Sequence, residues 1–106
     1  MAWLYVDGEM SKLRKSARNQ QCLIRIPGVC NWNPETTCLC HFNGGGMALK
    51  MDDMEGAFGC SDCHAAVDGK PTIKHGFSLM ETKLMFLEAG IRTRDYWRKN
   101  GFIKTV

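Results

Sequence analysis

The alternation of hydrophobic and polar positions predicts short helices and strands joined by connections rich in glycine and asparagine. In MSKLRKSARN, residues 10–19, Leu13 and Ala17 are four positions apart, which places both on one face of a helix with the cations outward. Ser11 is a candidate N-cap for this helix. Residues 1–10 are expected to form a loosely held leader before it.

The segment CLIRIPGVC, residues 22–30, has strand character up to Pro27. Pro27 and Gly28 are a turn signal, and the asparagine- and proline-rich stretch that follows is a loop by composition. We therefore expect a short strand and a turn that brings Cys22 and Cys30 close together.

A second strand is predicted in TTCLCHF, residues 36–42, where threonine and apolar residues favour extended backbone. Because side chains alternate along a strand, His41 is expected on the face opposite to Cys38 and Cys40. A glycine run ends this strand, and residues 50–59 give no clear periodicity.

Helices are expected in the second half of the chain. One begins near Cys60 and runs through CHAAVDG. Ser78 and Glu81 have the spacing of a capping box, which starts a helix, LMETKLMFLEA, that Gly90 is expected to end. A last helix, TRDYWRKN, closes at Gly101. This order of elements predicts one small α+β domain over residues 1–106.

Composition and charge narrow the function. A chain of 106 residues buries a modest core, so a bound metal or disulfides would help it considerably. The net charge is +3, and cations gather towards both ends while acidic residues lie in the middle. This distribution suggests a polyanion held beside a cation site. The cations expected to bind nucleic acid are Lys12, Arg14, Lys15, Arg18, Arg94, Arg98 and Lys99.

The cysteines bear on the compartment as well as on the chemistry. No apolar run approaches the roughly 20 residues that span a bilayer, and the first residues lack the order of a secretory signal. We therefore expect a cytoplasmic protein. In that reducing compartment, the six cysteines are expected to be metal ligands or buried thiols, although their even number would also permit disulfides.

Two separated cysteine pairs predict a structural zinc site. Zinc prefers four tetrahedral thiolate or imidazole ligands, and the spacing of Cys60 and Cys63 lets one turn of chain offer two sulfurs to one ion. Cys22 and Cys30 can supply the other half, because the turn between them folds their segments together.

Other interpretations of CSDCH, residues 60–64, remain open. A haem attachment site would require export, and a redox dithiol would require a strand before it in a βαβ unit. Cys38 and Cys40 are expected to be small apolar thiols of the core. His75, next to a glycine, is expected to be an exposed loop residue.

A strand ending in histidine, a loop with a polar residue and a CxxCH that opens a helix resemble the HNH, or ββα-metal (His-Me finger), nucleases. More closely, CLIRIPGVCNWNPETTCLCHF, GCSDCHAAVDG and EAGIRTRDYWRKNGFIK are similar to a family of small phage and prophage proteins classed as nucleases. The resemblance extends from about Lys12 to Lys104. It implies a zinc-stapled ββα-metal core with flanking helices and metal-dependent cleavage of nucleic acid, foremost DNA, in the cytoplasm of a bacterial host cell.

The resemblance also implies roles for single residues. His41 matches the general base, and His64 and Asp53 match the ligands of a catalytic Mg²⁺ or Mn²⁺, with Asp52 as the alternative to Asp53. Many HNH enzymes have an Asp or His directly before the general base, where this chain has Cys40. An imidazole suits the role of base, because its pKa lies near neutral pH. Phage recombination or replication proteins are expected as partners.

The competing hypothesis is a non-catalytic zinc module that binds DNA or a phage protein through the same basic surfaces. Such a module would need the four zinc cysteines but neither His41 nor His64. Cleavage of plasmid or single-stranded DNA in the presence of divalent ions would separate the two hypotheses.

Overall fold

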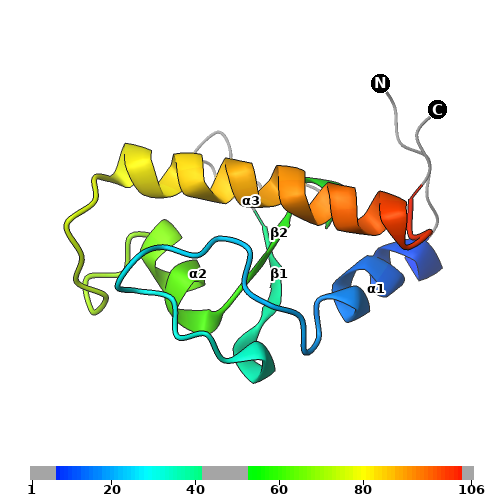
Figure 1. Cartoon of the computed structure of the whole chain (residues 1–106), viewed down its shortest axis with the longest axis horizontal. Coiled ribbons are helices and arrows are strands. Elements are labelled where there is room, and N and C mark those ends of the chain that lie inside the picture. Colours follow the sequence, from blue (N-terminus) through cyan, green and yellow to red (C-terminus); the bar gives the residue numbers. More distant parts are fainter. Residues whose placement is uncertain (1–6, 42–52, 104–106) are drawn as a thin grey trace.

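The computed structural model describes the backbone of residues 7–41 and 53–103, and side chains from residue 12 onward within those ranges (Figure 1). Residues 1–6 of the expected leader, and Asp52, therefore lie outside the described residues. Helix α3 runs along one side of the molecule, the two strands cross its middle, and α2 and α1 lie towards its two ends. The elements are α1 (Asp7–Ser16), the 3-10 turn η1 (Pro34–Thr36), β1 (Cys38–Cys40), the 3-10 turn η2 (Asp53–Glu55), β2 (Ala57–Gly59), α2 (Ser61–Val67) and α3 (Leu79–Lys99).

These elements make the predicted small α+β domain, with a two-stranded sheet and three α-helices among the described residues. None of those helices combines the length and the apolar character needed to cross a membrane.

Helix α1 begins at Asp7, earlier than predicted. Ser11 lies inside the helix and is not its N-cap, and residues 7–10 of the expected leader are helical. Aspartate also favours helix N-termini, so a single serine did not fix the start. Leu13 and Ala17 are buried as predicted, because their spacing depends on the helical period and not on where the helix begins.

The strand predicted before Pro27 is not formed. Its backbone is irregular, and Arg25 has a φ of 54°, which interrupts an extended chain. The segment still contacts the sheet, because the Leu23 amide donates to the Phe58 carbonyl at 2.9 Å. The turn itself is as predicted, with Gly28 at a φ of 76°.

Strand β1 was predicted and its partner β2 was not. The strands pair antiparallel, with Cys40 opposite Ala57 and Leu39 opposite Phe58. β2 is only three residues long, follows Gly56 and ends in Gly59, so it has no periodic pattern to detect. Close approach explains one of these glycines: a Cβ at Gly56 would lie 2.8 Å from the Cys40 carbonyl oxygen.

One continuous helix, α3, replaces the two helices predicted near the C-terminus. Its capping box at Ser78 and Glu81 is present as predicted. Gly90 does not end the helix but lies buried within it. Glycine in a helix interior costs about 1 kcal/mol, and the buried Phe86 and Trp97 on either side of it offset that cost by packing.

Two groups of buried side chains lie beneath α3. Neighbouring residues of the sheet enter different groups, because side chains alternate along a strand. The cysteine core contains Cys22, Ile24, Ile26, Val29, Cys40, Ala57, Cys60, Cys63, Ala66, Val67, Phe86 and Ala89. The aromatic core contains Leu13, Ala17, Leu39, Met54, Phe58 and Trp97.

Candidate functional site

The four cysteines predicted to bind zinc lie together. One sulfur from each of Cys22, Cys30, Cys60 and Cys63 lies within 4.8 Å of the others, and the sulfurs of Cys30 and Cys60 are 3.9 Å apart. Tetrahedral zinc with Zn–S bonds of about 2.3 Å places its sulfurs about 3.8 Å apart. The cysteines are free thiols, so this donor set fits a structural zinc ion.

Backbone amides donate hydrogen bonds to two of these sulfurs. The Arg25 amide donates to Cys22 Sγ at 3.5 Å, and the Cys63 amide donates to Cys60 Sγ at 3.4 Å. Cys60 is also the N-cap of α2. Contacts of Ser61 with the loop that follows Cys30 join the two halves of the site.

The pKa values of these thiols shift in opposite directions. A hydrogen bond with Cys63, helped by the Arg25 amide, lowers the pKa of Cys22 to about 4, while the pKa of its partner Cys63 is raised. Burial raises the pKa of Cys30 to about 11. Four thiolates this close repel one another, so a bound dication is the natural means of ionising all of them.

A second constellation joins His41 to the buried Asp53. His41 Nε2 lies 2.5 Å from Asp53 Oδ1, and the same carboxylate lies 3.0 Å from Arg14 Nε. Asp53 is only 1% exposed, so these two partners offset the cost of burying its charge. The sequence did not predict the contact with Arg14, which joins residues far apart in the chain and depends on the position of α1.

The tautomer of His41 follows from this contact. With Nε2–H donated to Asp53, Nδ1 is the nitrogen that can accept a proton. Helix α3 helps to hold Asp53 in place, because Arg94 Nη1 donates to the carbonyl of the neighbouring Met54 in η2 at 3.2 Å. Arg94 also belongs to the set of cations predicted to bind nucleic acid, and that role stays a prediction.

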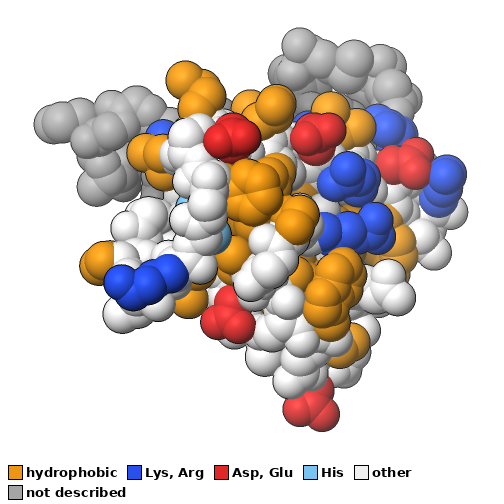
Figure 2. Space-filling view, turned by 60° about the vertical axis from the view of Figure 1, so that its left-hand side comes forward, with side chains coloured by type: hydrophobic (Ala, Val, Ile, Leu, Met, Phe, Trp, Pro, Cys, Tyr) orange, Lys and Arg blue, Asp and Glu red, His pale blue; other side chains and the backbone are white. Residues whose placement is uncertain are grey.

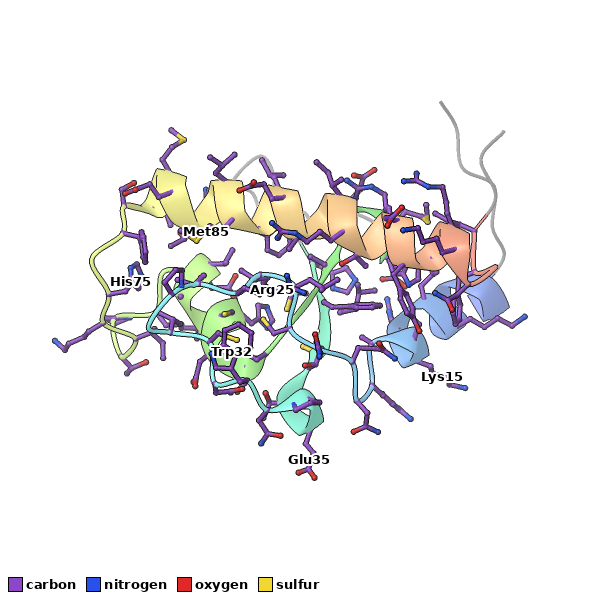
Figure 3. The ribbon with its side chains drawn as sticks, in the orientation of Figure 1. Lys15, Arg25, Trp32, Glu35, His75 and Met85 are labelled. Carbon is purple, nitrogen blue, oxygen red and sulfur yellow. The ribbon has the colours of Figure 1, made fainter. Side chains whose placement is uncertain are left out.

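His41 opens onto a cleft of about 520 Å³ that is also lined by Arg14, Arg18 and Cys38. Lys15 projects from α1 (Figure 3), and Glu35 also lines the cleft. A second cleft, of about 580 Å³, contains Lys99 of the predicted basic set. On the face in Figure 2, Lys and Arg side chains group together beside hydrophobic ones.

His64 does not share a ligand group with Asp53 among the described residues. Its ring nitrogen instead lies within 4.8 Å of the sulfurs of Cys38 and Cys40. Magnesium and manganese prefer oxygen ligands, so these donors do not fit the predicted Mg²⁺ or Mn²⁺ at His64.

The two strand cysteines differ from the predicted pair of core thiols. Cys40 is fully buried as expected, whereas Cys38 is exposed. Hydrogen bonds with Cys40 and then His64 lower the pKa of Cys38 to about 5. The hydrogen bond with Cys38, together with burial, raises the pKa of Cys40. The sequence signal for this cysteine pair was the CxC spacing directly before His41, which places both cysteines on one face of the strand.

Two further side chains lie on α3 and in the loop before it. Trp97 is fully buried and donates from Nε1 to Ser16 Oγ at 2.7 Å, so it packs the core. His75 lies in a loop as predicted but is only partly exposed (Figure 3). Its Nδ1 accepts from the Phe77 amide at 3.1 Å.

Comparison with known proteins places the chain in a family. A sequence model described as "Putative nuclease YbcO" matches residues 11–102. The chain belongs to the YbcO family. Two YbcO relatives are each 40% identical over 98 residues, which are 90% of this chain and 99% of the relative: "Putative nuclease YbcO" of Escherichia coli (strain K12) and "Putative nuclease ybcO" of Enterobacteria phage 82.

A solved structure has the same fold. It is described as "Structure of a putative bacteriophage protein from Escherichia coli str. K-12 substr. MG1655" and is 38% identical, with a TM-score of 0.70 over 85% of this chain and 100% of that chain. Membership of the YbcO family confirms the resemblance to phage and prophage proteins classed as nucleases. The HNH type remains a prediction.

Proposed function

We propose that this chain is an HNH-type endonuclease that hydrolyses phosphodiester bonds, foremost in DNA, with His41 as its general base. The observation that carries the proposal is the contact of His41 with the buried Asp53 beside a cleft lined by arginines. Membership of a family whose members are named as nucleases supports it.

The chemistry requires a base that takes a proton from water. Nδ1 of His41 is placed to do so, because Asp53 accepts the proton on Nε2 and so holds the ring in that tautomer. Asp53 therefore acts in the proposal as a positioning residue for His41.

Arginines at the cleft would hold the phosphates. Arg14 keeps its side chain 62% exposed while it contacts Asp53, and Arg18 lines the same cleft and is exposed. Guanidinium groups bind phosphate oxygens in a bidentate manner. A phosphodiester held by both would lie close to His41.

Metal ions have two separate roles in the proposal. The four-cysteine group would hold zinc that stabilises the fold, because the energy of binding a structural zinc is also folding energy. A second divalent ion, when bound, would stabilise charge on the leaving oxygen. His64 remains the proposed ligand of that ion, and Asp53 is assigned to His41 instead.

His41→Gln tests the proposal. Glutamine keeps an N–H for Asp53 but cannot act as a base, so we expect plasmid cleavage to fall about 10²- to 10⁴-fold. Zinc content, melting temperature and DNA affinity should stay close to wild type. His75→Gln, the same change at a histidine outside the cleft, should cleave normally. If wild-type protein cleaves no nucleic acid with any divalent ion, or if His41→Gln cleaves normally, the chain is a binding module.

A further inference from the structure

We propose that Cys38, Cys40 and His64 form a second metal site, separate from the four-cysteine site, which takes zinc or a similarly thiophilic divalent ion. Ion binding at this site is independent of the proposed nuclease activity. Only its consequence for cleavage rests on that proposed function.

The distances match a tetrahedral ion. The sulfurs of Cys38 and Cys40 are 3.9 Å apart, and both lie within 4.8 Å of a ring nitrogen of His64. A zinc ion with bonds of about 2.3 Å to sulfur separates two thiolates by about 3.8 Å. The pair is therefore spaced as two ligands of one ion, and it is far from the roughly 2.05 Å of a disulfide.

The fold brings these three side chains together from two elements. Cys38 and Cys40 occupy alternate positions of β1, so both sulfurs lie on one face of the strand. His64 lies on α2, which follows directly after β2. Gly59, the partner of Cys38 in the sheet, leaves room for the Cys40 sulfur: a Cβ there would lie 2.9 Å from Cys40 Sγ.

A carboxylate is placed to orient the histidine. Asp68 Oδ2 lies 3.4 Å from His64 Nε2, one helical turn further along the chain. Histidines that bind metals commonly share their second N–H with a carboxylate, which fixes the orientation of the ring. Asp68 thus supplies an outer partner of the kind that metal sites use.

Three protein ligands leave one tetrahedral position open, as in catalytic zinc sites. Cys38 is exposed and lines the same cleft as His41, so one ligand of the proposed site borders the place proposed for the phosphodiester. Thiolates select zinc, cobalt or cadmium over magnesium. The site would therefore give this nuclease a dependence on thiophilic ions, where the resemblance implied Mg²⁺ or Mn²⁺.

Counting bound zinc tests the site without any activity assay. Full-length protein is reconstituted with excess Zn²⁺, desalted and weighed intact by native mass spectrometry. The two ligand groups predict two zinc ions per chain for wild type. Cys38→Ser and His64→Gln should each keep one, since they leave the four-cysteine group intact.

Controls separate loss of a ligand from loss of the fold. His75→Gln and His41→Gln change histidines outside the group and should keep both ions. Cys38 is exposed, so Cys38→Ser should melt like wild type when each protein carries only the first zinc. In Co²⁺-loaded protein, Cys38→Ser should lose part of the thiolate-to-cobalt absorption, and His75→Gln should not.

One zinc in wild type, or two in both Cys38→Ser and His64→Gln, would overturn the second site. These outcomes are distinguishable from failure of the proposed function. A protein with two zinc ions that cleaves nothing would refute the nuclease and retain the site. A protein with one zinc that cleaves through His41 would do the reverse.

Discussion

The two cores beneath α3 are held together by different means. The cysteine core includes side chains from the segment between Cys22 and Cys30, whose backbone is irregular. It also contains three of the four cysteines of the proposed zinc group. The aromatic core packs Phe58 against Trp97, with ring centroids 5.9 Å apart, between α3 and α1. The difference teaches that packed side chains hold the helices together, whereas the irregular loop brings together thiols that the proposed zinc would join.

The candidate catalytic groups lie where the two cores meet. β1 sends Leu39 into the aromatic core and Cys40 into the cysteine core, and His41 follows directly. The strand therefore places the proposed base on the side of α1 and the proposed second metal site on the side of α2. Disturbing either core should consequently affect the site in a different way.

The largest expected effect is loss of the zinc group. Cys60→Ser removes one of the four proposed zinc ligands but keeps a side chain that can cap α2, and structural zinc binding is worth about 10–16 kcal/mol at pH 7 in small zinc-binding peptides. We expect the whole domain to unfold, as seen by circular dichroism, and a strong chelator to unfold wild type. Cys38→Ser is the matched control and should stay folded. A folded Cys60→Ser protein without metal would show that the cysteine core holds by packing alone.

A smaller loss of stability is expected when the aromatic core is disrupted. Trp97→Ala removes a fully buried ring and its hydrogen bond to Ser16, which should cost about 3–5 kcal/mol in urea unfolding. Trp32 is 67% exposed, so Trp32→Ala should change the free energy of unfolding by less than about 0.5 kcal/mol. If Trp97→Ala lowered the free energy of unfolding as little as Trp32→Ala, the aromatic core would contribute little to stability.

The contrast also explains what the sequence could predict. Local patterns held: the capping box at Ser78 and the buried pair Leu13 and Ala17 each require only residues within one helical turn. Features decided by distant packing did not. Gly90 stayed helical because buried side chains flank it in α3.

The candidate site shows the same division. The alternation along β1 predicted that Cys38 and Cys40 share one face of the strand, and their sulfurs are 3.9 Å apart. The partners of His41 and of these cysteines lie on α1, η2 and α2, and no sequence spacing fixes such distances. The contact of His41 with Asp53, and that of His64 with the strand sulfurs, therefore needed the structure.

A smaller effect is expected at the cleft. Arg18→Glu removes an exposed cation that lines the cleft and lies outside the Arg14–Asp53 ion pair, so it should weaken DNA binding without changing stability. The slope of log affinity against log salt should fall by about one for each phosphate that the protein no longer binds. Lys74→Glu carries a matching charge reversal on an exposed loop residue outside the cleft. Equal weakening by both variants would indicate a response to net charge alone.

The smallest effect is expected at the first turn of α3, before its buried residues begin. Ser78 Oγ accepts from the Glu81 amide at 3.1 Å, and the Ser78 amide donates to Glu81 Oε1 at 2.9 Å. Ser78→Ala should therefore cost about 1 kcal/mol in urea unfolding. Thr82, the next buried residue, should hold the rest of the helix in place.

The dependence of this cap on pH has a definite sign. The hydrogen bond from the Ser78 amide lowers the pKa of Glu81, so its carboxylate stabilises the folded state at neutral pH. That stabilisation is lost as the pH falls below the ordinary glutamate value and through the lowered one. The difference in stability between wild type and Glu81→Gln should therefore shrink towards pH 3, measured by urea unfolding at several pH values. A difference that stays constant with pH would show that the carboxylate is not the group that caps α3.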